Sequence, residues 1–102
     1  MPDFGTPFTG LQNARKLNHA ELVRAIRFMV ASEYEAVQLY QQLADSIDNK
    51  LAIEVLEDIA NEEKVHAGEF LRLLFELDPS ESTYYKDGAK EVEDEIKKLK
   101  GE

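Results

Sequence analysis

A glutamate and a histidine three residues apart, Glu63 and His66, are the side chains of this sequence best suited to hold a metal ion together. Residues three apart lie on the same face of an α-helix, so their carboxylate and imidazole can reach one ion. A further acid, Glu33, stands in an apolar stretch closer to the N-terminus. Two carboxylates and one imidazole make an oxygen-rich set, which favours iron or manganese over zinc.

Two long helices are predicted to position these residues. Asn18 followed by Glu21 is the pattern of a capping box, which indicates that a helix begins there. Apolar residues recur at helical spacing as far as a polar turn at 45–50, and the second helix is expected to end at Leu77, before Asp78–Pro79. The expected apolar stripes contain Leu22, Ile26, Met29, Val30, Val37, Tyr40, Ala44 and Ile47 in the first helix and Ala52, Leu56, Ile59, Phe70, Leu73, Leu74 and Leu77 in the second.

The position of the turn predicts which residues face each other. In an antiparallel hairpin that turns near residue 48, Glu33 lies level with Glu63, and His66 lies one helical turn beyond Glu63. An ionised carboxylate inside an apolar stripe is costly unless a partner or a metal ion compensates for its charge. Di-iron carboxylate bundles use a Glu from each of two helices and a Glu-x-x-His from each of the other two. This chain carries that set once, so a two-fold homodimer is predicted to complete the site.

The predicted fold is therefore all-α, in three segments. Residues 1–17 contain several Pro and Gly and are expected to form an irregular N-terminal arm. Residues 18–79 form the antiparallel helical hairpin, which dimerises into a four-helix bundle. Residues 80–102 are expected to form a short C-terminal helix and a charged tail, with a break at Gly88.

Composition limits the function classes. The chain has 102 residues, no cysteine and a net charge of −9. A single domain this short buries only about two-thirds of its unfolded surface, so association would add stability. The acidic excess argues against nucleic-acid binding, and the lack of cysteine excludes disulfides and thiolate metal sites. Without an apolar run of ~18 residues or a signal peptide, the chain is expected to be a soluble cytoplasmic protein.

Other side chains have both a functional and a structural interpretation. Tyr40 lies two turns from Glu33 on the same face, where its phenol could serve the metal site or simply pack in the core. Glu62 could be a weak metal ligand or an ordinary solvated helix residue. Glu35 lies on the back of the first helix near Phe28, where apolar side chains are either singly exposed or part of a second interface.

The stretches Ser32–Tyr40, Asn61–Glu69 and Phe70–Pro79 resemble the encapsulated ferritins and the ferritin-like domains of encapsulin systems, especially their archaeal-type variant. The resemblance covers roughly residues 18–96. It implies a ferritin-like four-helix bundle formed by a homodimer, and an annular assembly of such dimers. It also implies a ferroxidase that oxidises Fe(II) for iron storage and detoxification inside an encapsulin shell in the cytoplasm.

By this resemblance, the family's iron ligands and the tyrosine beside them fall at Glu33, Glu63, His66 and Tyr40. These four are the expected catalytic residues, with the iron shared between two chains; manganese, zinc or calcium could substitute for iron. Glu35 matches one of two acids through which the family admits metal, whereas Ser32 stands where the other acid would be. Cargo proteins of this family usually end in a short peptide that targets them to the shell, and the C-terminal run Lys97–Glu102 lacks a convincing one. We therefore expect either that this peptide is missing from this sequence or that the chain is the N-terminal part of a fusion to the shell protein.

Two alternatives remain open at this level. A rubrerythrin-like di-iron peroxidase would use the same ligands but reduce peroxide. A metal-free helical assembly module would keep Glu33 and His66 as buried polar contacts that fix the register of the helices. Iron titration tests these alternatives: two metal ions per dimer with oxygen uptake favour the ferroxidase, whereas no bound metal favours the assembly module.

Overall fold

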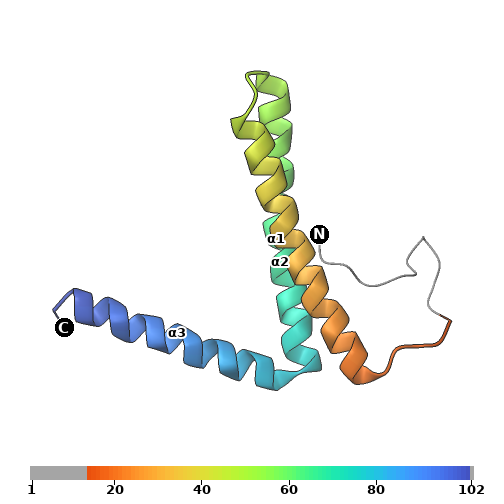
Figure 1. The fold of residues 1–102 in the computed structure, drawn as a ribbon, viewed down its shortest axis with the longest axis vertical. Coiled ribbons are helices and arrows are strands. Elements are labelled where there is room, and N and C mark those ends of the chain that lie inside the picture. The colour runs from red at the N-terminus through yellow and green to blue at the C-terminus, as the bar shows by residue number, and fades with distance from the viewer. Residues whose placement is uncertain (1–13, 102) are drawn as a thin grey trace.

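The computed structural model describes residues 14–101, which form three α-helices and contain no strand. Figure 1 shows α1 (His19–Asp45), α2 (Lys50–Leu77) and α3 (Pro79–Leu99). The predicted all-α class is confirmed. Most of the arm predicted for residues 1–17 lies outside the described residues, and residues 14–17 are not helical. None of the described helices is long and apolar enough to cross a membrane.

Side-chain caps explain where the first two helices begin. Asn18 Oδ1 accepts a hydrogen bond from the Glu21 amide at 2.9 Å, and Glu21 Oε1 accepts one from the Asn18 amide at 3.0 Å, so the predicted capping box is confirmed. Arg15 adds hydrogen bonds to both Glu21 oxygens and, as the main cause, lowers the pKa of that carboxyl to about 2. The Asn49 side chain accepts from the Ala52 amide at 2.9 Å and caps α2.

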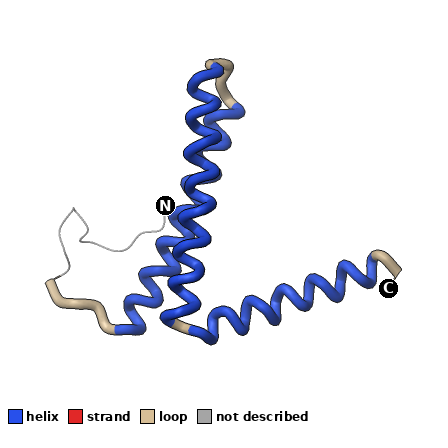
Figure 2. The backbone as a smooth tube through the Cα atoms, turned by 180° about the vertical axis from the view of Figure 1, so that it is seen from behind, coloured by secondary structure: helices blue, strands red, loops and turns tan. Residues whose placement is uncertain are grey.

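Helices α1 and α2 lie side by side and run antiparallel, joined by a short turn (Figures 1 and 2). At the open end of this hairpin, His19 Nε2 lies 2.7 Å from the Leu77 carbonyl oxygen. Because a carbonyl can only accept, the imidazole donates this hydrogen bond and satisfies a terminal group of α2. The two long helices are thus tied at both ends.

The core of the hairpin is thin. Two members of the predicted apolar stripes, Leu22 and Leu73, are 37% and 43% exposed in the single hairpin, so they do not belong to the contact between α1 and α2. Val23, which was not predicted, is buried. Successive residues of an α-helix point about 100° apart around its axis. Measured in this way, the buried side chains of each helix point roughly 40° away from the direction of Glu33 or Glu63, so the two acids lie to one side of the contact between the helices. The buried apolar side chains of the described chain are Val23, Ile26, Val30, Val37, Ala44, Ala60, Ala67 and Leu74.

Helix α3 follows α2 almost without a linker and leaves the hairpin at a steep angle (Figure 1). Asp78 caps it through the Ser80 amide, and Pro79 occupies its first turn, where no amide proton is needed. The break predicted at Gly88 is wrong, since the helix continues through that residue to Leu99. One interior glycine costs only about 1 kcal/mol relative to alanine, which a well-capped helix of this length can tolerate.

Replacing Gly88 by alanine is expected to stabilise α3 by about 0.5–1 kcal/mol, because alanine restricts the unfolded chain and favours the helix. A Cβ at Gly88 would meet nothing within 4 Å. Thermal unfolding followed by circular dichroism measures the gain.

The matched control is Gly101→Ala. Gly101 ends α3 with a φ of +79°, a conformation that alanine adopts only with strain. This variant should therefore show no gain. Loss of helicity in Gly88→Ala would contradict the expectation.

Candidate metal centre

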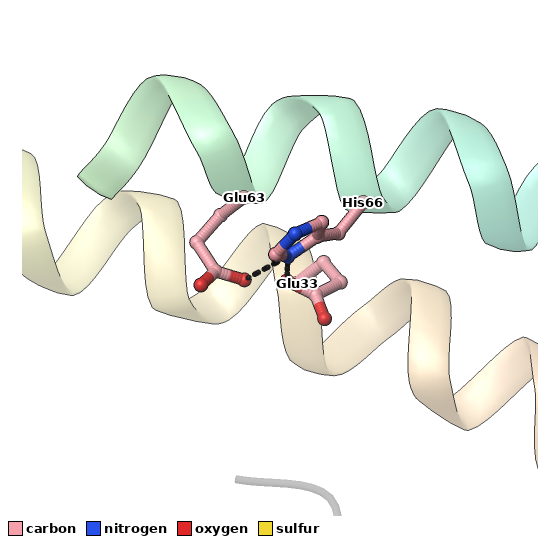
Figure 3. Close-up of side chains that lie close together, drawn as sticks. All are labelled: Glu33, Glu63 and His66. Carbon is pink, nitrogen blue, oxygen red and sulfur yellow. Dashed lines mark ion pairs between the residues drawn. The ribbon is translucent and has the colours of Figure 1, made fainter. Parts of the chain in front are cut away.

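Glu33 from α1 and Glu63 and His66 from α2 point toward one another across the hairpin (Figure 3). One potential ligand atom from each of the three lies within 4.8 Å of the others. His66 Nδ1 is 3.6 Å from Glu63 Oε2 and 3.9 Å from Glu33 Oε2. The structure thus brings together all three residues that the sequence singled out as ligands, at the level predicted from the turn.

The Glu33 carboxylate is incompletely satisfied. Its Oε2 atom is buried and accepts no hydrogen bond from the described residues, and the 3.9 Å separation from His66 is too long for one. A buried anionic oxygen without a partner costs free energy. A cation between the three side chains would compensate this cost, and two carboxylates with an imidazole suit iron or manganese. The side chains present therefore fit a metal ion.

The three side chains differ in exposure. The Glu33 and Glu63 side chains are 17% and 19% exposed, whereas His66 is 47% exposed. The acids lie beside the line of contact between the helices, and His66 lies further out on the same side. The centre is therefore open on one side of the hairpin, which we call the site face.

The site face is largely apolar. Large apolar side chains with substantial exposure flank the three polar residues along the whole length of the hairpin. Around the axis of their helix, these side chains point within about 80° of the direction of Glu33 or Glu63, and they lie on the same side as His66. They are Leu22, 37% exposed, Leu43, 48%, Val55, 47%, and Leu73, 43%. Exposed apolar side chains at both ends of a polar centre indicate an interaction site.

The other predicted site residues lie outside this group. Tyr40 is half-buried on α1, while Glu62 and Glu35 are exposed. Neither acid belongs to the cluster of potential ligands, and Glu35 is on the far side of α1 from Glu33. Their predicted roles, like those of the three clustered residues, stay predictions.

Sequence reasoning missed a second polar cluster at the junction of the helices. Arg27 of α1 forms an ion pair with Glu81 of α3, which also accepts a hydrogen bond from the Tyr85 hydroxyl at 2.6 Å. Arg27 and Glu81 are 54 positions apart, so no local pattern could have indicated the pair.

Three comparisons with known proteins agree on one family. A family model described as Rubrerythrin matches residues 22–100. The chain is 39% identical over 74 residues to the ferritin-like-encapsulin shell fusion protein of Pyrococcus furiosus, covering 72% of this chain and 21% of that protein. It is 36% identical over 73 residues to the encapsulin nanocompartment cargo protein EncC of Myxococcus xanthus, covering 72% of this chain and 56% of that protein.

The fold is also similar to a solved structure. The crystal structure of the encapsulated ferritin domain from Pyrococcus furiosus matches with a TM-score of 0.81 and 33% sequence identity, over 98% of each chain. This chain therefore spans nearly all of that domain. It spans about a fifth and about half of the two curated relatives.

Replacing Glu33 by glutamine is expected to stabilise the metal-free protein by about 1 kcal/mol. The change removes the negative charge of a half-buried carboxylate, whose Oε2 accepts no hydrogen bond from the described residues, from beside Glu63, and the amide can donate a hydrogen bond. Thermal unfolding in the presence of a chelator measures the difference. Glu62→Gln, a change to an exposed acid of the same kind, should leave the melting temperature unchanged. A lower melting temperature for Glu33→Gln would contradict the expectation.

Proposed function

Because this chain belongs to the rubrerythrin family of ferritin-like proteins, and within it to the encapsulin-associated ferritin-like proteins, we propose that it is a ferroxidase whose two-iron site is shared by two copies of the chain. The observation that carries the proposal is the cluster of Glu33, Glu63 and His66, in which a buried carboxylate oxygen accepts no hydrogen bond from the described residues. The cluster opens onto an apolar face that a second copy can cover.

A single chain offers too few ligands for two metal ions. Two carboxylates and one imidazole satisfy about half of what a di-iron pair requires in a four-helix bundle. A two-fold axis through the site face would set a second, identical cluster against the first. The same pairing would remove the exposed leucines and valine of that face from water, at roughly 25 cal/mol for each Å² of apolar surface buried.

Fe(II) is the substrate in this proposal. Each Fe(II) gives up one electron, so a pair supplies the two electrons that reduce O₂, with two protons, to hydrogen peroxide. Glu33 and Glu63 bind the iron and neutralise its charge, and they favour Fe(III) over Fe(II) because the more highly charged ion gains more from carboxylates. His66, as a neutral imidazole, binds through one ring nitrogen.

Other acids and Tyr40 have supporting roles in the proposal. The net charge of −9 raises the concentration of Fe(II) near the protein. Exposed Glu62, near His66, attracts the ion toward the site face, and Glu35 serves the admission of metal on the outer side of α1. Tyr40 is half-buried on α1, two helical turns from Glu33 on the same face, and in this proposal its phenol donates a hydrogen bond or an electron to the site.

The relatives suggest where the reaction takes place. One matched relative is a fusion to an encapsulin shell and another is an encapsulin cargo protein. We extend this to the present chain: as cargo or as one domain of a fusion, it oxidises iron inside an encapsulin compartment, for storage and detoxification. Two-fold dimers that join into a ring complete the proposed assembly.

A di-iron peroxidase is the second candidate, since the matched family model is that of rubrerythrin. The ligands and the electron count are the same, but hydrogen peroxide is the oxidant and is reduced to two molecules of water. Measuring O₂ and peroxide consumption side by side with Fe(II) distinguishes the two. Consumption of peroxide alone would favour the peroxidase.

Titration of the purified protein with Fe(II) in air is expected to saturate at two iron ions per dimer. Because Glu63 and His66 each supply a ligand, Glu63→Ala and His66→Ala should slow iron oxidation by at least about 100-fold. The Fe(III) absorbance in stopped-flow mixing reports the rate. Glu54→Ala removes an exposed acid on the far side of α2 and should keep the full rate. Unchanged oxidation in both ligand variants would disprove the assignment.

A charged substitution on the site face should abolish iron oxidation although it leaves Glu33, Glu63 and His66 unchanged. Leu73→Asp is expected to prevent pairing, since an aspartate in the covered apolar surface is left without a partner. Light scattering should then show the loss of the dimer, and iron oxidation should fall with it. Val65→Asp, at a 63% exposed position away from the site face, should retain both. An active monomer would show that one chain suffices.

A further inference from the structure

The angle between α2 and α3 holds an apolar hollow outside the metal centre. It has a volume of about 530 Å³ and is lined by Phe75 near the end of α2 and by Pro79, Tyr85 and Ala89 of α3. We call it the junction groove. Pockets of about 300–1,000 Å³ bury drug-sized ligands, so a hollow of this size can hold a few side chains of a peptide.

The floor of the junction groove continues the core of the hairpin. Phe75 is half-buried and packs against the cluster of Val23, Ile26 and Leu74. The Tyr85 ring meets Phe75 edge-on, with centroids 5.3 Å apart, yet Tyr85 stays 47% exposed. An apolar side chain in the groove would therefore extend the core onto α3, a helix in which no residue is buried.

Residues 1–13, which lie outside the described residues, have the composition of a segment that packs against a surface. Their one charged residue is Asp3, whereas 32% of the whole chain is charged. They include Phe4, Phe8 and two of the three prolines of the chain. Solvated tails are typically rich in charge and poor in aromatic residues. Proline-containing segments bind aromatic-lined grooves at a low cost in conformational entropy.

This segment joins the described chain beside the junction groove. It is followed by Ala14, five residues before His19, whose Nε2 lies 2.7 Å from the Leu77 carbonyl oxygen at the end of α2. A second hollow of about 440 Å³ lies at the start of α1 and shares Pro79 with the junction groove. The ten residues between Phe4 and Ala14 span up to about 33 Å when extended. The segment can therefore reach the junction groove by way of the second hollow.

We propose that residues 1–13 occupy the junction groove of their own chain. Phe4 packs against Tyr85 in the groove. Phe8, closer to the start of α1, covers the second hollow, which Val23 lines. The docked segment fills the angle between α2 and α3 and so braces α3 in its direction. This contact lies within one chain and is separate from the metal centre.

Charge selects which phenylalanine enters the junction groove. Arg72 and Lys86 line the groove beside its apolar floor. Arg72 Nη1 already donates to Glu76 Oε2 at 3.1 Å, whereas Lys86 forms no ion pair within residues 14–101. Asp3 directly precedes Phe4, so its carboxylate pairs with Lys86 when Phe4 lies in the groove. An exposed ion pair adds little stability, and this one therefore sets the register while the aromatic contact supplies the attraction.

The tether favours the segment of the same chain over that of another copy. A flexible linker of about ten residues holds its ligand at an effective concentration on the order of 1 mM. The segment of a separate copy, present at micromolar concentration, competes poorly with it. The groove is therefore filled within each chain, whatever the number of copies in an assembly.

Paired cysteines test the register, and the sequence has no cysteine of its own to interfere. A chain that carries Asp3→Cys and Lys86→Cys is oxidised in dilute solution, and mass spectrometry follows the loss of both thiols. Its intrachain disulfide should form about 10-fold faster than that of a chain with Asp3→Cys and Asp87→Cys. Asp87 is the matched control, because it is exposed one residue further along α3 and does not line the groove. Equal rates, or disulfides that join two chains instead, would overturn the proposal.

Hydrogen exchange tests the brace without a cross-link. Phe4→Ser should speed the exchange of amide hydrogens in residues 83–92 of α3 by about 3-fold or more, because local opening of the helix becomes easier when the contact is lost. Thr6→Ser, a small change in the same segment, should leave the exchange as in the wild type. Unchanged exchange in Phe4→Ser, or an equal rise in both variants, would refute the docking.

The outcome does not depend on the proposed ferroxidase. Phe4 and Thr6 are not among the potential metal ligands, so iron binding and iron oxidation should be the same in both variants as in the wild type. Exchange reports the groove and iron oxidation reports the metal centre. A loss of iron oxidation in Phe4→Ser would contradict the separation of the two and would also count against the proposal.

Discussion

The level pairing of Glu33 with Glu63 across the hairpin is the constraint on which the other features depend. It brings two acids and His66 within 4.8 Å of one another and leaves Glu33 Oε2 buried without a hydrogen bond from the described residues. A sequence selected only for stability would place an apolar side chain there. The loss of stability is explained if the three side chains bind a cation. The negative charge that destabilises the metal-free protein would then increase its affinity for the cation.

Two helices alone cannot bury all the apolar side chains that this hairpin carries. Two helices in contact can each bury one stripe, and the buried side chains here are mostly small or branched, with Leu74 the largest that is fully buried. Leu43 and Val55 remain exposed on the site face, and half-buried Leu71 lines a groove on the opposite side. Apolar surface on both sides of a two-helix layer is what a building block of a larger helical assembly requires.

Contacts at the junction of the three helices fix the direction in which α3 leaves the hairpin. An exposed ion pair usually contributes less than about 1 kcal/mol. The Glu81 side chain, however, is only 12% exposed and binds both Arg27 and Tyr85, so the three groups hold one another in place. The direction of α3 thus rests on contacts between side chains rather than on the short link at Asp78. Helix α3 extends from the open end of the hairpin, and the three potential metal ligands lie on the site face, so these two surfaces can serve different partners.

Local sequence patterns predicted the boundaries of α1 and α2 and the meeting of the three polar residues, but not the extent of α3, which continues through Gly88. Caps such as Asn18 and Asn49 are local, and the level of Glu33 and Glu63 follows from the turn and the constant rise of a helix. Tertiary structure alone decided how far each helix is rotated about its axis, which exposes Leu73, and how α3 is held by Arg27. These features depend on packing between residues distant in the chain, for which periodicity carries no signal.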